Sequence, residues 1–428
     1  MSNLSQINAI VIDNGRFAEF ACVLAREYGK VWYCPMYTEP YPTMKHGAIG
    51  TGMEGLTVVQ KPWDVPFDKI DLWVFPTLGF GSMQADLVRQ GARVFGARMG
   101  EEIELERCAV KEYLRKGGME INPYVKLVGT KALREYLKKH DNVHVKTERW
   151  RADCESFKST SYKESEPLVD EIEHNLGPFK YIFEFCVEDD LPDCVELGTD
   201  CISVDGQFPE NTYCGIEVKD CGMVGSMMPW KDIPEPVTRV NRILSPLMKQ
   251  YQYRAPFSTE VRIDKKLVPH PLDQTTRFPI PPNETYQELY ANLPQMVWDA
   301  ANGILTQSKP LAKFGCQVIM RSKGAWSDHN AIPFDIPDKW RRNIKLLYPV
   351  KIDGRYYTIP QNSEGGNVGS IVGWGDTLDA ARKMCQKAAE SVNAVTIKKP
   401  VEVLDEAEKE FEKAEKFGLR MLPKAGAS

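Results

Sequence analysis

The apolar positions in the first hundred residues follow two alternating patterns. A short apolar run, INAIVID (7–13), predicts a buried strand, and after the turn Asn14-Gly15 the apolar positions take a helical spacing that ends near Gly29. Similar short runs predict further strands at 30–35, 69–77 and 92–96. Because strands that alternate with helices form parallel sheets, we predict a small Rossmann-like domain here, although DNGRF is not a full dinucleotide-binding fingerprint.

After residue 100 the chain contains both helical and strand-type spacing of its apolar residues. A charged helical pattern runs from Glu101 to Gly117-Gly118, where glycines are typical of a helix end. The later patterns predict a strand at 142–146, a polar stretch to about 165, a helix at 166–175, a strand at 180–190 and a helix at 236–250. Residues 369–392 predict a strand, a Gly-Asp turn and a helix, and the charged helix after residue 400 is expected on the surface.

The stretch PLDQTTRF (271–278) has an unusual pattern of polar side chains. Asp273, Thr275 and Arg277 occupy alternate positions, and successive side chains of an extended chain point to opposite faces, so these three share one face. An acid, a hydroxyl and a guanidinium on one face form either a solvated sheet edge or one wall of a polyanion site.

Composition narrows the class of protein. The chain has 428 residues, 43% of them hydrophobic, which suffices for two or three domains, and its formal net charge of −5 gives no signal for nucleic acid or an anionic membrane. Its apolar runs stay short of the roughly 20 residues that cross a bilayer, and its first residues lack the pattern of a signal peptide. Eleven scattered cysteines without a CxxC pair predict free thiols. We therefore expect a globular, cytoplasmic protein.

Four segments, in the same order along the chain, resemble the phosphoribosylamine–glycine ligase family (glycinamide ribonucleotide synthetase) of the ATP-grasp superfamily. They are NGRFAEFACVLA near the start, GARVFGARMGEEIELERCAVKEYLRKGGMEINPYV (91–125), LDQTTRF (272–278), and VGWGDTLDAARKMCQKAAESV near the end. The collinear order, which spans nearly the whole chain, is more specific than any single segment.

This resemblance implies an α/β (α+β) chain with the ATP-grasp fold. The implied domains are a Rossmann-like preATP-grasp domain at 1–100, an ATP-grasp core at 101–305 with a lid subdomain at 122–190, a small C-terminal domain at 306–400 and a charged C-terminal helix at 401–428.

The resemblance also implies an ATP-dependent ligase that joins a carboxylate to an amine through an acyl phosphate. ATP and Mg²⁺ are the implied cofactors, and the implied partners are a small carboxylic acid, such as glycine or another amino acid, and an amine. A homodimer stays open.

The metal and phosphate positions of the family are carried over residue by residue. Asp273 and Thr275 fall at the two metal-binding positions of the last core strand, and Glu260 in STEVRID falls near the additional metal carboxylate. A short turn between antiparallel strands would bring Glu260 and Asp273 together. Arg277 falls at the phosphate-facing arginine, and Lys219 in GIEVKD follows a strand where the family often has a cation that faces phosphate or substrate.

The nucleotide positions are carried over in the same way. Lys146 falls at the lysine that contacts ATP phosphates, and Arg107 aligns with another phosphate-contacting lysine. FEFCVEDDLPDCVELG resembles the adenine and ribose hinge, with Glu184 at its start, the backbone of Phe185–Val187 on the adenine edge, and either Glu188 or Glu196 on the ribose hydroxyls.

The chain departs from the family in three places. Asp273 and Thr275 stand for a glutamate and an asparagine, the segment after Lys146 (TERWRADCESFKSTSYK) contains no glycine to cradle phosphates, and PIPPNE replaces the motif GDPE. In that segment Arg149, Arg151 and Lys158 could supply side-chain charge instead. These departures leave a second hypothesis open, a nucleotide-binding regulatory protein without turnover. A Rossmann-type oxidoreductase is the weakest reading.

Overall fold

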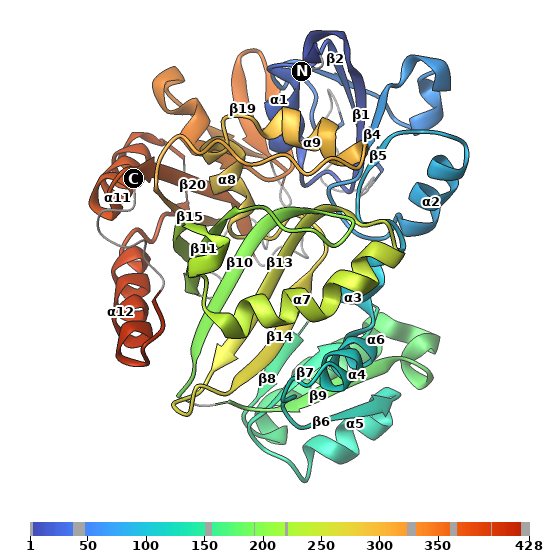
Figure 1. Cartoon of the computed structure of the whole chain (residues 1–428), viewed down its shortest axis with the longest axis vertical. Coiled ribbons are helices and arrows are strands. Elements are labelled where there is room, and N and C mark those ends of the chain that lie inside the picture. The colour runs from blue at the N-terminus through green and yellow to red at the C-terminus, as the bar shows by residue number, and fades with distance from the viewer. Residues whose placement is uncertain are drawn as a thin grey trace.

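The computed structural model describes residues 3–36, 48–149, 156–191, 193–218, 221–322, 331–359, 366–394 and 396–420. These residues form four sheets with helices packed around them, and the largest sheet runs through the centre of the molecule (Figure 1). The predicted α/β class is confirmed.

The first sheet has five parallel strands in the order β3-β2-β1-β4-β5. Its elements are β1 (Asn8–Asp13), α1 (Ala18–Ala25), β2 (Lys30–Pro35), β3 (Leu56–Val58), β4 (Leu72–Val74), α2 (Gly81–Arg89) and β5 (Val94–Phe95). This order is that of a Rossmann-type half, so the predicted architecture is confirmed. The pattern does not predict β3, because its three residues are only partly buried and carry no apolar run.

The helix predicted from Glu101 to Gly117 is wrong in one respect, because it is broken into α3 (Glu102–Leu105) and α4 (Arg107–Lys116). The break lies at Glu106, whose backbone φ and ψ of −100° and 63° are not helical. It exposes the first N–H groups of α4, and the Glu148 carboxylate accepts from two of them, those of Arg107 and Cys108, at 2.8 Å each. The break therefore creates a new helix N-terminus, capped by a side chain from a distant segment.

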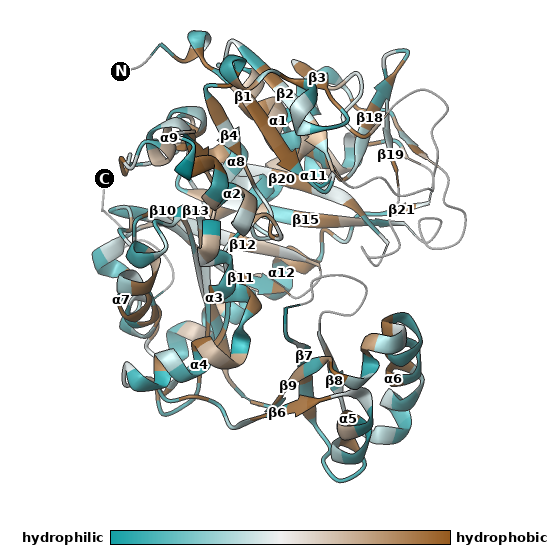
Figure 2. Ribbon diagram, turned by 90° about the vertical axis from the view of Figure 1, so that its right-hand side faces the viewer, coloured by the Kyte–Doolittle hydropathy of each residue, from teal (hydrophilic) through white to brown (hydrophobic). Residues whose placement is uncertain are grey.

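Residues 124–189 form a separate lobe, called the lid lobe below, at the lower right of Figure 2. Its antiparallel sheet has the order β6-β9-β7-β8. The elements are β6 (Tyr124–Val128), α5 (Thr130–Leu137), β7 (Val143–Thr147), β8 (Ser156–Ser159), α6 (Tyr162–Leu176) and β9 (Glu184–Asp189). Both helices contribute side chains to one small apolar core with the sheet, so the lobe has an interior of its own.

Two parts of the lid lobe differ from the prediction. The stretch up to 165, predicted only to be polar, contains the strand β8, and α6 begins at Tyr162 rather than near 166. The strand β8 pairs on one side only, with β7, so it is an edge strand with mostly polar residues and gives a weak periodic signal.

The central sheet has the strand order β14-β13-β10-β11-β12-β15-β20-β17, and β21 also pairs with β15. Its strands are β10 (Val195–Val204), β11 (Asn211–Val218), β12 (Gly222–Pro229), β13 (Arg254–Ile263), β14 (Pro269–Thr275), β15 (Phe314–Ser322), β17 (Ile344–Leu346), β20 (Asn367–Gly375) and β21 (Ile397–Lys398). The pairing of β12 with β15 continues the sheet without a break across the boundary predicted at residue 305.

Helices cover the central sheet. The helix α7 (Glu235–Gln250) packs on β10 and β13, and Thr259 of β13 bonds to Asn241 of α7. Because neighbouring strand residues face opposite sides, Ser258 and Glu260 point to the face away from α7. The remaining helices of this region are α8 (Asn283–Leu289), α9 (Leu293–Ala301), α11 (Leu378–Ser391) and α12 (Val403–Lys416).

Of the last two helices, α11 agrees with its prediction from the sequence, and α12 agrees only in part. The predicted strand, turn and helix over 369–392 are confirmed as β20 and α11. The charged helix α12 was expected on the surface, and its polar face does lie there, but its apolar side packs on β11 and β12. The side chains buried on that side are Val403, Leu404, Ala407, Phe411 and Ala414.

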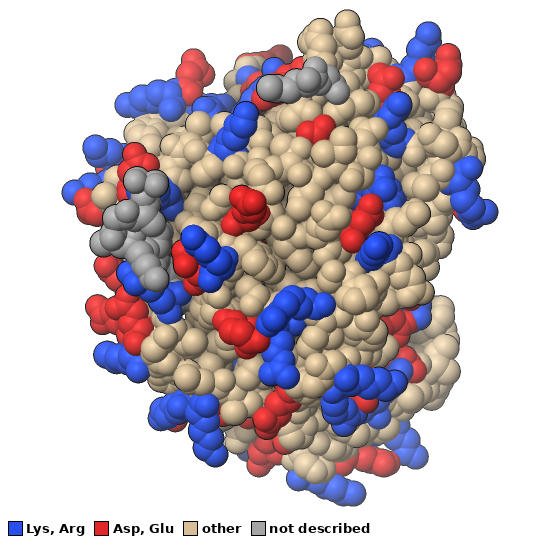
Figure 3. All heavy atoms as spheres, in the orientation of Figure 1, with Lys and Arg blue, Asp and Glu red and all other residues tan. Residues whose placement is uncertain are grey.

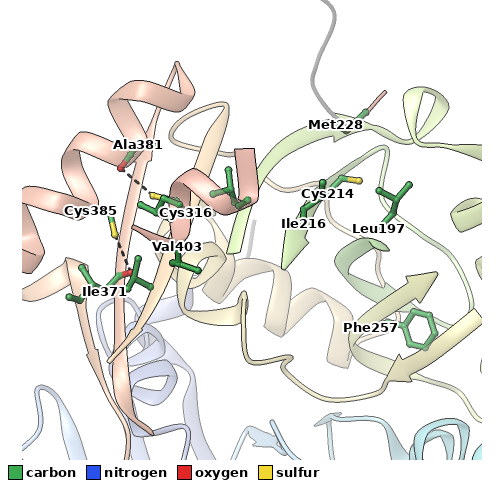
Figure 4. Close-up of a cluster of buried hydrophobic side chains, with 14 of the residues drawn as sticks. Leu197, Cys214, Ile216, Met228, Phe257, Cys316, Ile371, Ala381, Cys385 and Val403 are labelled. Atoms are coloured by element: carbon green, nitrogen blue, oxygen red, sulfur yellow. Dashed lines mark hydrogen bonds between the residues drawn. The ribbon is translucent and has the colours of Figure 1, made fainter. Parts of the chain in front are cut away.

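Figure 4 shows part of the apolar core between α11 and the central sheet. Two cysteine thiols donate hydrogen bonds there, Cys316 Sγ to the Ala381 carbonyl at 3.3 Å and Cys385 Sγ to the Ile371 carbonyl at 3.5 Å. The ten cysteines that the structure describes are free thiols, and most are buried, as the sequence predicts. The fourth sheet is small and consists of β16 (Ile332–Phe334), β19 (Arg355–Thr358) and β18 (Pro349–Ile352) in the C-terminal region.

The surface carries charges of both signs. On the face drawn in Figure 3, Lys and Arg side chains are interspersed with Asp and Glu side chains. None of the helices in the described part of the chain is long and apolar enough to cross a membrane.

Glu288 of α8 is the centre of a buried ion-pair cluster that joins distant parts of the chain. Arg26, after α1, donates to both carboxylate oxygens at 2.9 and 2.7 Å, Arg342 donates at 2.7 Å, and the buried Lys345 of β17 also donates. Burial raises the pKa of Glu288, but Lys345 and Arg26 outweigh burial, so the net pKa lies well below its usual range. The cluster therefore ties the first domain to the C-terminal region through an ionised carboxylate.

We predict that Glu288→Ala lowers the free energy of unfolding by about 3–5 kcal/mol, because it leaves the buried Lys345, with 2% of its side chain exposed, without its partner. Thermal denaturation measures this change. Glu390→Ala, at an exposed site on α11, is the matched control and should change stability by no more than about 0.5 kcal/mol. Equal melting temperatures for the two variants would contradict the role given to Glu288.

Candidate active site

The register of four neighbouring strands places polar side chains in rows on the face away from α7. Glu196 of β10 lies opposite Arg262 of β13, and two residues further Gly198 lies opposite Glu260. Asp200, in the next row, lies opposite Ser258. Directly opposed residues share a face, so this face carries an ordered set of acids.

The strand β14 completes the face. Ser258 pairs with Thr275, and the register shifts by a bulge between Thr259 and Val261, beside Asp273. Asp273, Thr275 and Arg277 line one hollow, which answers the question raised by PLDQTTRF: their shared face is the wall of a cleft. The predicted approach of Glu260 and Asp273 across the hairpin is also present, since both line that hollow.

The cleft consists of three hollows that share Glu217 and Glu260 as lining residues. The outer hollow, about 290 Å³, lies between the lid lobe and the central sheet. The middle hollow, about 120 Å³, contains Arg107 and Arg277, and the deep one measures about 20 Å³. The three hollows therefore adjoin one another around these two carboxyls.

Asp273 binds two cations from different parts of the chain. Lys146 Nζ, at the end of β7 in the lid lobe, lies 3.3 and 3.2 Å from its two carboxylate oxygens, and Arg107 at the start of α4 also donates to it. Lys146 further pairs with Glu188 of β9 at 3.3 Å, and Lys111 of α4 pairs with Glu188 at 3.1 Å. The predicted ATP residues Arg107, Lys146 and Glu188 are thus brought together with Asp273.

Burial and these pairings set the charges of the cluster. Burial raises the pKa of Asp273, but Arg107 and Lys146 outweigh burial and hold that pKa well below its usual range. Burial lowers the pKa of Lys146, yet Asp273 and Glu188 raise it to a net value above normal. Asp273 is therefore ionised and Lys146 protonated near neutral pH, which leaves a cationic group positioned where a polyanion would enter.

Glu260 behaves in the opposite way. Burial raises its pKa far above the usual range, and the neighbouring carboxyls of Glu196, Glu217, Asp273 and Asp200 raise it further. A divalent cation would relieve this repulsion, and the carboxylates of Glu260 and Asp273 with the Thr275 hydroxyl offer the oxygen ligands that Mg²⁺ prefers. The residues present therefore fit a magnesium ion at the predicted metal positions.

Arg277 is held by the short helix α3. Its Nε donates to Glu104 at 3.2 Å, and the backbone N–H of Thr276 donates to the same carboxylate at 2.7 Å. This support fixes the guanidinium in the lining of the middle hollow, which Asp273 also lines.

The hinge prediction for Glu184 and Phe185–Val187 needs correction. β9 is a central strand of the lid sheet, paired with β6 on one side and β7 on the other, so its backbone groups there are already used. Phe185 and Val187 point into the lid core, and Glu184 pairs with Lys126 at 2.9 Å. None of these four residues lines a hollow of the cleft.

The other predicted residues divide into two groups. Glu196 lines the outer and deep hollows and pairs with Arg262 at 2.9 Å, whereas Lys219 and Arg151 lie outside the described residues. The remaining lid cations do not line the hollows: Arg149 pairs with Glu106, and Lys158 pairs with Asp190 at 2.5 Å.

Three residues of the site were missed by the sequence analysis. Glu217 lines all three hollows, Glu104 supports Arg277, and Asp200 lies in the deep hollow. A signal exists for Asp200 alone, since an acid in the middle of the stretch VELGTDCISV, four residues after Glu196, is unusual for a central strand. The other two depend on strand and helix neighbours that the sequence does not show.

Asp200 is almost completely buried, with 2% of its surface exposed. Burial raises its pKa to about 7, and the Ser258 hydroxyl, which bonds to it, opposes this shift. The Oδ1 atom has no hydrogen-bond partner. An acid in this state weakens the fold whenever it is ionised.

Comparisons with known proteins were made for the sequence and for the fold. No protein-family model matches the sequence, and no curated protein matches it. Solved structures do match: phosphoribosylamine–glycine ligase from Thermotoga maritima has a TM-score of 0.66 at 17% identity, over 92% of this chain and 99% of that one. Biotin carboxylase from Campylobacter jejuni, solved as a complex with a β,γ-ATP compound, has a TM-score of 0.65 at 14% identity, and the match covers 94% of this chain and 95% of that one. L-amino acid ligase from Bacillus licheniformis has a TM-score of 0.57 at 13% identity, and the match covers 91% of this chain and 98% of that one.

These matches cover nearly the whole of each chain, and the protein has the ATP-grasp fold. Its predicted resemblance to phosphoribosylamine–glycine ligase is confirmed at the level of that fold.

We predict that Asp200→Asn stabilises the protein, and more so as the pH rises. The folded-state pKa of Asp200, about 7, lies above the ordinary 3.8, so its favourable contribution is complete below pH 3.8 and is lost as the pH rises through 7. The advantage of the variant should therefore grow by about 3 kcal/mol between pH 5 and pH 8.

Melting temperatures of both proteins at the two pH values measure this effect. Asp379→Asn, at a carboxylate that is 71% exposed, is the control and should show no such growth. A lower melting temperature for Asp200→Asn at pH 8 would contradict the prediction.

Proposed function

We propose that the protein is an ATP-dependent ligase that joins a carboxylate to an amine through an acyl phosphate. The observation that carries this proposal is the meeting of Lys146 from the lid lobe and Arg107 from α4 at Asp273, beside Glu260 and Thr275. The names of the similar structures support it, since phosphoribosylamine–glycine ligase and L-amino acid ligase both join such groups.

Each group has a role that its surroundings suggest. Arg107 and Lys146 neutralise the phosphates of ATP, and Arg277, which lines the middle hollow together with Arg107, faces the phosphoryl group that is transferred. Glu260, Asp273 and Thr275 would hold Mg²⁺, which supplies charge neutralisation at the phosphates when bound. Transfer gives the substrate carboxylate a leaving group, and attack by the amine then forms the amide and releases phosphate.

We assign the ribose contact to Glu196 rather than Glu188. The Glu188 carboxylate is buried and already pairs with two lysines, Lys111 and Lys146. Glu196 is only partly buried, pairs with one arginine and lines the outer hollow. Its carboxylate therefore retains acceptor capacity toward a hydroxyl at the entrance.

A second candidate function is nucleotide binding without turnover. It is favoured by the internal neutrality of the site, because Arg107 and Lys146 are paired by Asp273 and Glu188. Thr275, a weaker metal ligand than an amide or carboxylate, favours it as well.

Release of ADP and phosphate from Mg-ATP separates the two candidates. We expect release that depends on an added carboxylic acid, tested with glycine and a panel of amino acids in the presence and absence of amines. Asp273→Asn should lower the rate by about 100-fold or more, because it uncouples the metal and both cations. Asp379→Asn is the matched control and should retain the wild-type rate. Binding of Mg-ATP without acid-dependent release from any mixture would favour the second candidate.

We also predict that Lys146→Met weakens Mg-ATP binding by about 10–100-fold, the effect of losing one charged contact to phosphate. Equilibrium titration with Mg-ATP measures it without requiring turnover. Lys180→Met, also in the lid lobe but paired with Glu173 at 2.9 Å and not among the residues that line the cleft, should bind as the wild type does. Equal affinity of the two variants would show that Lys146 does not contact the nucleotide.

A further inference from the structure

The deep hollow of the cleft is the most unusual part of the molecule. It lies beyond Glu260, and its floor is Asp200 of β10. None of the three cations proposed to contact the phosphates, Arg107, Lys146 and Arg277, is among its lining residues, although the proposed ribose contact Glu196 and the metal position Glu260 are. It therefore needs an explanation of its own.

Two glycines create this space. Gly198 and Gly215 lie opposite each other on β10 and β11, in the row beside Glu260, and both line the hollow. A Cβ at Gly215 would lie 2.5 Å from the Val224 carbonyl oxygen, whereas one at Gly198 would meet only ordinary contacts. The volume of about 20 Å³ accommodates one group of the size of water or ammonium.

The charge of the hollow is of one sign. Its lining contains the carboxyls of Asp200, Glu196, Glu217 and Glu260, and none of the residues that line it is basic. The Oδ1 atom of Asp200, with the residue only 2% exposed, is without a hydrogen-bond partner. A buried acceptor in this state calls for a ligand that donates hydrogen bonds and carries positive charge.

Beside these acids the hollow has an apolar wall, formed by Met223, Pro281 and Pro282, which offers no side-chain oxygen. Carboxyl oxygens also suit Mg²⁺, so the apolar wall is the feature that favours an ammonium group with a carbon stem over a metal ion. An alkylammonium has three N–H donors and an apolar stem, so Asp200, the Ser258 hydroxyl and the apolar wall suit it.

We propose that the deep hollow is a binding site for a primary ammonium group of the substrate, with Asp200 as its principal acceptor. This inference rests on the proposed function, since it names the class of substrate for that ligase: a small molecule with a protonated amino group that enters past Glu260. Asp200 is thus a residue that determines substrate specificity, and it does not contact the nucleotide.

Equilibrium binding of ethylammonium chloride to the full chain tests the site, both with and without Mg-ADP and against sodium chloride at equal ionic strength. We expect the wild type to bind ethylammonium and Asp200→Asn to bind it about 10–100-fold more weakly, because one charged hydrogen bond is lost. Tetramethylammonium has the same charge but no N–H donor, and it should not bind to either protein.

The affinity for Mg-ADP, measured for the wild type and for Asp200→Asn, distinguishes a failure of the ammonium site from a failure of the proposed ligase function. If Asp200→Asn binds Mg-ADP as the wild type does and loses only ethylammonium, the site is supported, and failure of acid-dependent turnover would then concern the ligase proposal alone. No binding of ethylammonium to the wild type, or equal binding to both proteins, would overturn the site. Weaker Mg²⁺ binding in Asp200→Asn would also overturn it, because Asp200 would then be a metal ligand. A higher melting temperature of the unliganded variant shows that a lost affinity is not caused by misfolding.

Discussion

The ion pairs of Asp273 hold the lid lobe and the core of the protein in contact across the cleft. Lys146 reaches this carboxylate from the end of β7, Arg107 reaches it from the start of α4, and Asp273 itself lies on β14 of the central sheet. Removal of one partner from such a buried set leaves an uncompensated charge, which costs several kcal/mol. The positions of the metal ligands and of the cationic wall both depend on this arrangement.

The pKa values of the carboxyl groups differ in direction between two parts of the cleft. Around Asp273 and Glu188, cations hold the pKa of each carboxyl low, whereas deeper in the cleft burial and like charge raise the pKa of Glu260 and Asp200. The same residue type therefore has opposite behaviour at two depths of one site. Such a gradient suits a polyanion at the entrance, a metal ion between, and a cationic group at the far end.

Local patterns in the sequence predicted much of this site. The alternation in PLDQTTRF places Asp273, Thr275 and Arg277 on one face, and a short hairpin suffices to bring Glu260 near them. Those inferences succeed because period-two alternation and hairpin pairing are local properties.

The errors have a common physical cause, which is that strand neighbours are not local. Whether β9 is a central or an edge strand decides if the backbone of Phe185–Val187 is available, and only the lid sheet order reveals that it is not. Glu217 joins the cleft because β11 pairs with β10, and Glu104 does so because the helix breaks at Glu106. The resemblance to a known family supplied the order of segments but not these contacts.

The cap that Glu148 makes on α4 restricts how the cleft can open. Glu148 lies two residues beyond Lys146, its N–H bonds to the Glu184 carbonyl of β9, and its carboxylate accepts from the first two N–H groups of α4. A swing of the lid lobe away from α4 would break both charged hydrogen bonds, at a cost of roughly 3–6 kcal/mol. The lid strand and α4 therefore form one mechanical unit, so a hinge for the exchange of ligands has to lie elsewhere, and Lys146 and Arg107 keep their spacing while it moves.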